Sequence, residues 1–165
     1  MRFLFFIFFL SFNSVFAQTI LLDEDFSSTT QDGLPDLWSQ YTLSDDGGWL
    51  NGMSNDLQSE WWGIAPHGTF VATNDDACDC NKSEDFLITP PLNFGEMDNV
   101  ILSFASFFSG ETFQGNTDRA TIEYSLDGGD SWIVLIEIAG NGNADNTVWE
   151  NHSINLSEIL EYSDV

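Results

Sequence analysis

The apolar residues of this chain fall into short alternating runs bounded by glycine, asparagine and aspartate, and no segment carries a long helical repeat. Alternation separates two faces of a β-strand, whereas a helix needs apolar residues three or four positions apart. The pattern therefore predicts an all-β chain. The expected strands are Thr19–Asp25, Leu37–Leu43, Thr69–Thr73, Asp85–Thr89, Val100–Phe108, Ala120–Ser125, Trp132–Ile138 and Val148–Ile154, with one helical turn at Leu156–Leu160.

Eight short strands separated by turns are typical of two antiparallel sheets packed face to face, as in a sandwich or jelly roll. The segment Val100–Phe108 is apolar on nearly both faces, so we expect it to be a central strand. One face of the later strand is expected to be core and comprises Trp132, Val134, Ile136 and Ile138. The chain is 42% hydrophobic and 15% aromatic, which provides enough apolar side chains for a folded domain rather than a disordered one.

Residues 1–17, MRFLFFIFFLSFNSVFA, have the features of a secretory signal peptide. One early charge, Arg2, is followed by an apolar run and then by small residues, which predicts cleavage before Gln18. The apolar run is shorter than the roughly 20 residues that a membrane span needs. We therefore expect residues 18–165 to form one exported domain, secreted or at the cell surface, without membrane insertion.

Acidic side chains dominate the expected mature chain, which has two basic residues, Lys82 and Arg119, against 27 acidic ones. Such a surface repels phosphate backbones, so nucleic acid is excluded as a partner. It attracts divalent cations where several carboxylates converge, although solubility alone also explains a high charge.

The stretch NDDACDCNKSEDFLITPP contains both cysteines, Cys78 and Cys80. Oxidation is the default in an exported chain, so a disulfide between them is predicted. It would fix the backbone beside Asp75 and Asp76. Zinc and redox roles are disfavoured, because the spacing is not Cys-x-x-Cys and neither histidine is near in sequence.

Three tryptophans, Trp49, Trp61 and Trp62, stand in segments rich in glycine and polar residues. Tryptophan rings in loops can stack on a ligand such as a sugar, but tryptophan is also usually buried. The sequence leaves both interpretations open.

The stretch YSLDGGDSW resembles the Asp-box of sialidases and other β proteins. Its matching positions are Ser125, Asp127, Gly129, Ser131 and Trp132. The resemblance implies a structural turn. A sialidase site would need several arginines, and the expected mature chain has only Arg119.

A wider set of segments resembles, in order, the cleaved-adhesin or choice-of-anchor J family, which includes relatives of the adhesin modules of gingipain proteases and is similar in architecture to MAM domains. The segments are LLDEDF, GLPDLW, NDDACDCNKSEDFLITPPL, VILSFASFF, ATIEYSLDGGDSW and INLSEIL. The resemblance implies a jelly-roll sandwich. Such domains continue beyond the equivalent of Asp164 with two or more strands, so the last strands are expected to be missing from residues 18–165.

The resemblance also implies structural calcium, held by Glu24 and Asp25 before Phe26 together with Asp75 and Asp76 of the mid-chain loop. Carboxylates on loops suit calcium, but the same acids are also ordinary solvated turn residues. A rival acidic loop, Asp45–Asp46–Gly47–Gly48, is interpreted as a plain turn.

The function that the resemblance implies is a non-catalytic, calcium-stabilised adhesion or binding module of a larger multidomain protein. Its partner would be a host or matrix protein or a glycan. One alternative is a carbohydrate-binding module of a secreted hydrolase, in which Trp49, Trp61 or Trp62 stacks on the sugar. Another is a glycosidase or peptidase, although no sequence feature selects a catalytic pair and His67 and His152 have no evident nucleophile partner.

Overall fold

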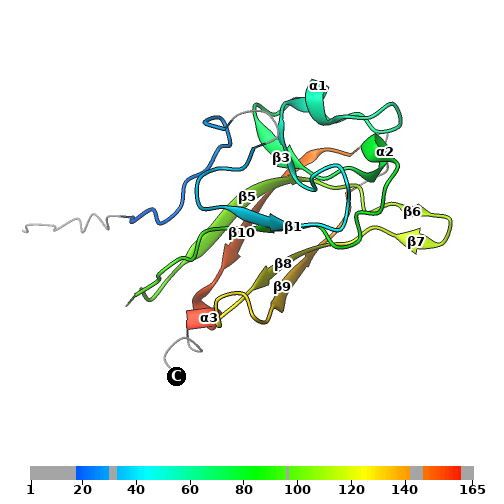
Figure 1. Ribbon diagram of the computed structural model, residues 1–165. Coiled ribbons are helices and arrows are strands. Elements are labelled where there is room, and N and C mark those ends of the chain that lie inside the picture. Colours follow the sequence, from blue (N-terminus) through cyan, green and yellow to red (C-terminus); the bar gives the residue numbers. More distant parts are fainter. Residues whose placement is uncertain (1–17, 30–32, 96, 142–146, 161–165) are drawn as a thin grey trace, which may run out of the picture.

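The computed structural model describes residues 18–29, 33–95, 97–141 and 147–160, so the predicted signal at residues 1–17 lies outside the described residues. Strands dominate the described part of the chain (Figure 1). They are β1 (Ser39–Tyr41), β2 (Leu50–Gly52), β3 (Phe70–Ala72), β4 (Phe86–Ile88), β5 (Ile101–Phe107), β6 (Thr112–Phe113), β7 (Asn116–Thr117), β8 (Ala120–Tyr124), β9 (Ile133–Ile138) and β10 (Trp149–Asn155). Three helical turns accompany them: α1 (Ser54–Leu57), α2 (Asp75–Cys78) and α3 (Ser157–Leu160).

The described strands pair antiparallel in five two-stranded ladders, β1–β4, β2–β3, β5–β10, β6–β7 and β8–β9. The longest ladder joins β5 to β10 in a register that runs from Trp149 opposite Phe107 to Asn155 opposite Ile101. Figure 1 shows this ladder along the length of the molecule, with α1 and α2 at one end and α3 at the other. The described part contains no helix with the length and apolar character needed to cross a membrane.

Seven of the eight expected strands are confirmed. The helical turn expected at Leu156–Leu160 is confirmed as α3. The expected strand Thr19–Asp25 is wrong, because this segment forms no ladder with any described strand. Its acidic end instead makes a local turn: Phe26 adopts a φ of 59° and donates its backbone N–H to Glu24 Oε1 at 2.6 Å. The strand Val100–Phe108 is present as β5, but among the described strands it pairs only with β10.

A β-bulge changes which residues of β9 face the core. Ile136 lies opposite Ile122, but Val134 lies opposite the next residue, Glu123, so Leu135 is the extra residue of the bulge. On one side of the bulge Ile138 is buried, whereas on the other side Val134 is 56% exposed. The expected single core face of Trp132, Val134, Ile136 and Ile138 is therefore wrong in its first half, where Trp132 is exposed too.

Two clusters of buried apolar side chains pack at opposite ends of the β5–β10 ladder. The first lies beneath α1 and the loop that follows it, and consists of Leu57, Ile64 and Phe70 with Leu50, Trp62, Ala72, Phe107 and Trp149 packed against them. The second lies at the α3 end and consists of Val100, Leu156 and Ile159 with Phe94, Met97, Leu102, Tyr124, Leu135 and Ile154 packed against them. The first cluster supports the candidate site described below.

The turn between β8 and β9 has the geometry that its resemblance to the Asp-box implies. Asp127 Oδ1 accepts hydrogen bonds from the Ser125 hydroxyl at 2.7 Å and from the Ser131 N–H at 2.9 Å, and Oδ2 accepts one from the Ser131 hydroxyl at 2.5 Å. Gly128 and Gly129 adopt φ values of 77° and 99°, which glycine tolerates best. The motif is a structural turn.

We expect this turn to weaken in strong acid. Hydrogen bonds from Ser131 and Ser125 lower the pKa of Asp127 to about 2, below its value in an unfolded chain. The stabilisation by these bonds is therefore complete above about pH 4 and is lost as the pH falls towards 2. Carboxyl chemical shifts followed by NMR during acid titration check this, and a midpoint near 4 would contradict it.

Candidate functional site

The loop between α1 and β3, residues 58–69, is the most prominent candidate surface. Ser59 organises its first half: the Ser59 hydroxyl accepts hydrogen bonds from the N–H groups of Trp61 at 3.2 Å and Trp62 at 2.9 Å. The Ser59 N–H in turn donates to the Trp62 carbonyl at 3.0 Å. These bonds close a tight turn that carries two consecutive tryptophans.

Two aromatic side chains brace this loop from below. The Trp62 ring packs against Phe107 at 5.4 Å between centroids, as part of the first apolar cluster. Trp149 donates its indole N–H to the carbonyl of Ala65 in the loop at 2.8 Å, and its ring stacks on His67 at 4.1 Å. The loop is therefore fixed to β5 and β10 at several points along its length.

Trp61, in contrast, points into solvent. Trp61 is 72% exposed, compared with 40% for Trp132. Its neighbour Trp62 is half-buried. Trp49, the third predicted stacking residue, is also half-buried and donates its indole N–H to the Asp85 carbonyl at 3.1 Å. Of the three candidates, Trp61 is the one available to a ligand.

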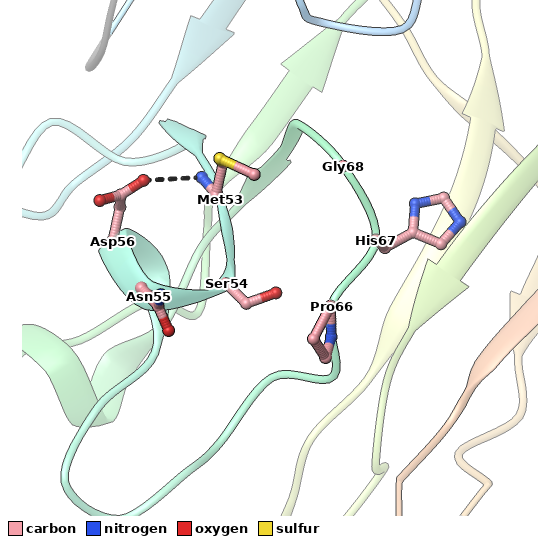
Figure 2. A pocket seen from close by; sticks show the side chains of 7 residues that line it. All are labelled: Met53, Ser54, Asn55, Asp56, Pro66, His67 and Gly68. Atoms are coloured by element: carbon pink, nitrogen blue, oxygen red, sulfur yellow. Dashed lines mark hydrogen bonds between the residues drawn. The ribbon is translucent and has the colours of Figure 1, made fainter.

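A hollow of about 200 Å³ lies where this loop begins and ends (Figure 2). One wall comes from Met53 and helix α1, and the other from the segment before β3. Its lining residues are Met53, Ser54, Asn55, Asp56, Pro66, His67 and Gly68. The hollow thus brings an amide, Asn55, and an apolar methionine together beside the loop that carries Trp61. The Asp56 carboxylate points away from Pro66–Gly68 and accepts the Met53 N–H at 2.9 Å (Figure 2).

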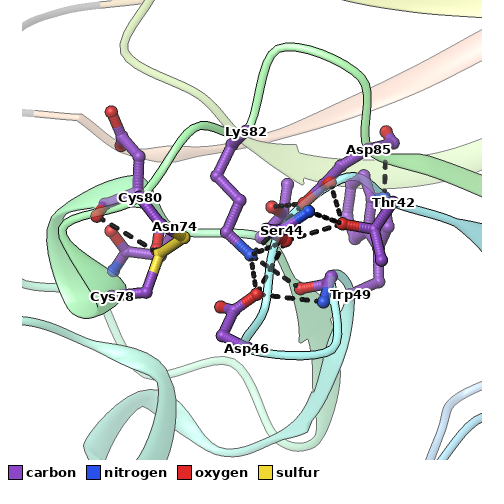
Figure 3. Close-up of polar contacts among 12 residues, drawn as sticks. Thr42, Ser44, Asp46, Trp49, Asn74, Cys78, Cys80, Lys82 and Asp85 are labelled. Atoms are coloured by element: carbon purple, nitrogen blue, oxygen red, sulfur yellow. Dashed lines mark hydrogen bonds and ion pairs between the residues drawn. A yellow bond between two sulfur atoms is a disulfide. The ribbon is translucent and has the colours of Figure 1, made fainter.

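A second polar centre surrounds Lys82, the only lysine of the chain (Figure 3). The Lys82 ammonium donates to Asp46 Oδ1, to the Ser44 hydroxyl at 3.1 Å and to the Gly48 carbonyl at 3.3 Å. It also lies 3.3 Å from Asp85 Oδ2. Four oxygen groups therefore surround one nitrogen.

Both acids of this centre have further partners. Asp85 accepts hydrogen bonds from the hydroxyls of Thr42 and Thr73, each at 2.5 Å. Burial would raise the pKa of Asp46, but hydrogen bonds from Lys82, Gly48 and Ser44, together with the charge of Lys82, lower it overall. The side chain of Lys82 is 9% exposed and that of Asp85 is 2% exposed, so this is a nearly buried ion pair.

The disulfide lies beside this centre. Cys78 at the end of α2 is bonded to Cys80, with the two Cα atoms 5.2 Å apart. Within the described residues, Asp46, Cys78 and Cys80 form the one group of three or more possible metal ligands whose donor atoms lie within 4.8 Å of one another. Disulfide sulfurs are not thiolates, so this group does not bind metal in the oxidised chain.

The four predicted calcium ligands are not brought together in such a group. Glu24 and Asp25 accept hydrogen bonds inside their own turn, where Asp25 Oδ1 binds the N–H of Ser27 at 2.9 Å. Asp75 and Asp76 form the first turn of α2 on a different part of the chain. Calcium binding by these four residues therefore stays a prediction. Two of them, Glu24 and Asp25, already accept hydrogen bonds from neighbouring residues.

Asp75 and Asp76, the predicted calcium ligands of the mid-chain loop, have two acidic neighbours that the sequence did not indicate, Glu111 and Asp118. Burial raises the pKa of Asp118, and the charges of Asp75, Asp76 and Glu111 raise it further. The pKa of Asp76 is raised by burial and then by the charges of Asp75 and Glu111. The Asp118 N–H donates to the Glu111 carbonyl at 3.0 Å, which ties both acids to the base of the β6–β7 hairpin. Negative charge thus accumulates between α2 and this hairpin.

Both histidines have structural surroundings in the described chain. His67 stacks on Trp149, and His152 stacks on Phe104 at 4.7 Å and shares a hydrogen bond of 2.8 Å with Ser106.

Comparison of the chain with protein-family models, curated proteins and solved structures gave no match.

Proposed function

We propose that this chain is a non-catalytic binding module that acts outside the cell and recognises its ligand through the α1–β3 loop. The observation that carries the proposal is Trp61, which is 72% exposed on a loop that hydrogen bonds and aromatic packing otherwise hold in place. Exposing a large aromatic ring to water is unfavourable, and exposed aromatic rings on rigid supports are typical binding residues. Bracing by Trp62 and Trp149 lowers the ordering cost of binding, because the loop is organised before the ligand arrives.

The ligand class follows from charge. With 27 acidic residues in the chain, acidic glycans and anionic surfaces are repelled, so the ligand is neutral or basic. The hollow beside the loop adds a hydrogen-bonding group, the amide of Asn55. A neutral glycan or a basic segment of a matrix or host protein fits both features.

The wider setting of the module is also part of the proposal. We place it in the cleaved-adhesin or choice-of-anchor J family, with a jelly-roll sandwich, on the ordered set of motifs that runs from LLDEDF to INLSEIL. Export of the chain is supported by the signal-like residues 1–17. A role as one module of a larger secreted or surface protein follows from the same resemblance.

Replacing Trp61 with alanine is expected to abolish most of the binding without affecting folding, because the ring contacts solvent. The test is a screen of the chain against immobilised neutral glycans and extracellular matrix proteins. Phe113 of β6 provides a matched control, since it is 74% exposed and lies outside the candidate loop. Equal loss of binding in Trp61→Ala and Phe113→Ala would contradict the proposal.

A carbohydrate-binding module is the specific form of this function that the hollow favours. An exposed tryptophan face suits the apolar face of a sugar ring, and the Asn55 amide in the hollow on the same loop region suits its hydroxyls. Selective retention of neutral glycans on the screen would support this form, whereas retention only of proteins stripped of glycans would support a protein adhesin.

Calcium is proposed as a structural stabiliser through Asp75 and Asp76, with Glu24 or Asp25 as the predicted further ligands. Burial raises the pKa of Asp76 and Asp118, and the charges of neighbouring acids raise it further. A cation bound between these groups would relieve the repulsion between them, which supports the proposal. A cation that binds only the folded chain adds about 2.7 kcal/mol at a hundredfold excess over its Kd. The melting temperature should rise more in calcium than in equal magnesium.

The variant Asp75→Asn, Asp76→Asn sharpens this test. In a chelator it should be at least as stable as the parent chain, because it removes repulsion that raises the pKa of Asp118. In calcium it should lack the calcium-specific increase. Equal melting shifts in calcium and magnesium for the parent chain would refute the site.

A further inference from the structure

The Lys82 ammonium, unlike that of an ordinary surface lysine, is surrounded by several oxygen groups of the kinds that also bind metal ions. Two carboxylates, of Asp46 and Asp85, lie around one nitrogen together with the Ser44 hydroxyl and the Gly48 carbonyl. Carboxylate, hydroxyl and backbone carbonyl oxygens are also the groups that calcium selects. The ammonium here has the same oxygen neighbours that a divalent cation would have.

The loop geometry shows that this arrangement does not depend on the lysine alone. The turn before β2 is set by Gly47 and Gly48, with φ values of 98° and 79°. Asp46 Oδ1 is positioned by the Gly48 N–H at 3.1 Å and by the Ser44 hydroxyl at 2.8 Å. Asp85 is positioned by hydroxyls of Thr42 and Thr73. Both carboxylates are therefore held in place by hydrogen bonds from groups other than Lys82.

Space for further ligands lies next to Asp46. A cavity of about 50 Å³ is lined in part by Asp46, Asp56 and Asn74. Asn74 is 9% exposed, and its side-chain oxygen has no hydrogen-bond partner among the described residues. Such a cavity has room for at least one water molecule, which needs roughly 10–15 Å³ of this kind of space. A water here would have both Asp46 and the unpartnered Asn74 oxygen as neighbours and would supply a further ligand towards the six to eight that calcium takes.

We propose that Lys82 fills a preformed divalent-cation site with its own ammonium, and that removing the ammonium opens this site to calcium. In the natural chain the Lys82 ammonium supplies the positive charge between the two carboxylates, so this centre needs no metal. Calcium stabilisation of the natural chain would then arise elsewhere, at Asp75 and Asp76. The two claims are independent and can fail separately.

The test compares Lys82→Ala with Arg119→Ala in thermal melts with chelator, calcium or magnesium. Alanine removes the whole lysine stem, so no side-chain atom is left where the ammonium was. Each variant loses one positive charge, but Arg119 is 66% exposed in its ion pair with Glu137, so it controls for general screening. Both are made in the Asp75→Asn, Asp76→Asn background to remove the α2 contribution. Calcium should raise the melting temperature of Lys82→Ala in a saturable manner, with a Kd of about 10⁻⁴–10⁻³ M, and magnesium at least about tenfold less effectively. Arg119→Ala should show no saturable shift.

Terbium provides a second readout, since it replaces calcium and emits when a nearby tryptophan is excited. The Trp49 indole is bonded to the Asp85 carbonyl, so Lys82→Ala should give emission that calcium competes away. Adding Asp46→Asn should weaken terbium binding about tenfold or more, because one carboxylate is lost. If Lys82→Ala is unfolded in chelator, circular dichroism should show folding in calcium but not in magnesium. Lys82→Ala that responds to calcium no more than Arg119→Ala, or that stays unfolded in calcium, overturns the proposal.

Discussion

Replacing Asp85 with alanine is expected to lower the free energy of unfolding by about 3–5 kcal/mol, the range for removal of one partner from a buried ion pair. The change leaves the Lys82 ammonium, 9% exposed, with Asp46 as its remaining carboxylate. It also removes the acceptor of the Thr42 and Thr73 hydroxyls. Urea denaturation measures the loss.

Asp36→Ala is a suitable control for this measurement, because Asp36 is exposed and surface changes usually alter stability by less than about 0.5 kcal/mol. A loss at Asp85 no greater than the loss at Asp36 would show that the Lys82 centre contributes nothing to stability.

Replacing Trp149 with alanine is expected to cost about 3 kcal/mol and to loosen the α1–β3 loop. The ring packs against Phe70 at 5.1 Å and Phe107 at 5.4 Å, and its N–H holds the carbonyl of Ala65 at 2.8 Å. Amide hydrogen exchange in residues 58–69 should accelerate along with the loss of stability. Urea denaturation and exchange measured by mass spectrometry check both effects.

Trp149→Phe separates packing from hydrogen bonding. It keeps an aromatic ring but removes the bond to Ala65, so the expected cost is about 1 kcal/mol. If both variants leave the exchange of residues 58–69 unchanged, then Trp149 does not brace the loop.

Most of the strands were predictable because they coincide with short apolar runs bounded by turn residues. Phe86–Ile88 lies in one such run, and Ile101–Phe107 lies in another that is apolar on nearly both faces. The short strands β2, β6 and β7 were missed, since their residues are mostly polar or glycine and form no apolar run. Thr19–Asp25 had the composition of a strand, but hydrogen bonds from Phe26 and Ser27 to its acidic end favour a local turn.

The Lys82 centre was not predictable from local sequence. Asp46 lies in a loop interpreted as a plain turn, which is correct for Gly47 and Gly48 but omits the role of the carboxylate. The partners are separated by 36 positions along the chain, so only the fold brings them together. The one available signal was Lys82 itself, because a single lysine among so many acids is a natural ion-pair partner.

The tryptophan pair shows how structure resolves an ambiguity that sequence leaves open. Trp61 and Trp62 are adjacent and chemically identical, so composition gives no reason to separate them. The turn at Ser59 directs Trp62 towards Phe107 and leaves Trp61 in solvent. One tryptophan therefore stabilises the loop, and the other is free to contact a ligand.

The most direct test of the proposed binding surface is a titration of the strongest ligand from the screen against the parent chain, Trp61→Ala and Asn55→Ala. A stacked aromatic contact is worth about 1.4 kcal/mol or more, so Trp61→Ala should raise the Kd at least about tenfold. Asn55→Ala should raise it less but measurably, because Asn55 lines the adjacent hollow. The melting temperature should stay unchanged in both. A Kd that is the same for all three proteins would contradict the assignment of the α1–β3 loop as the binding surface.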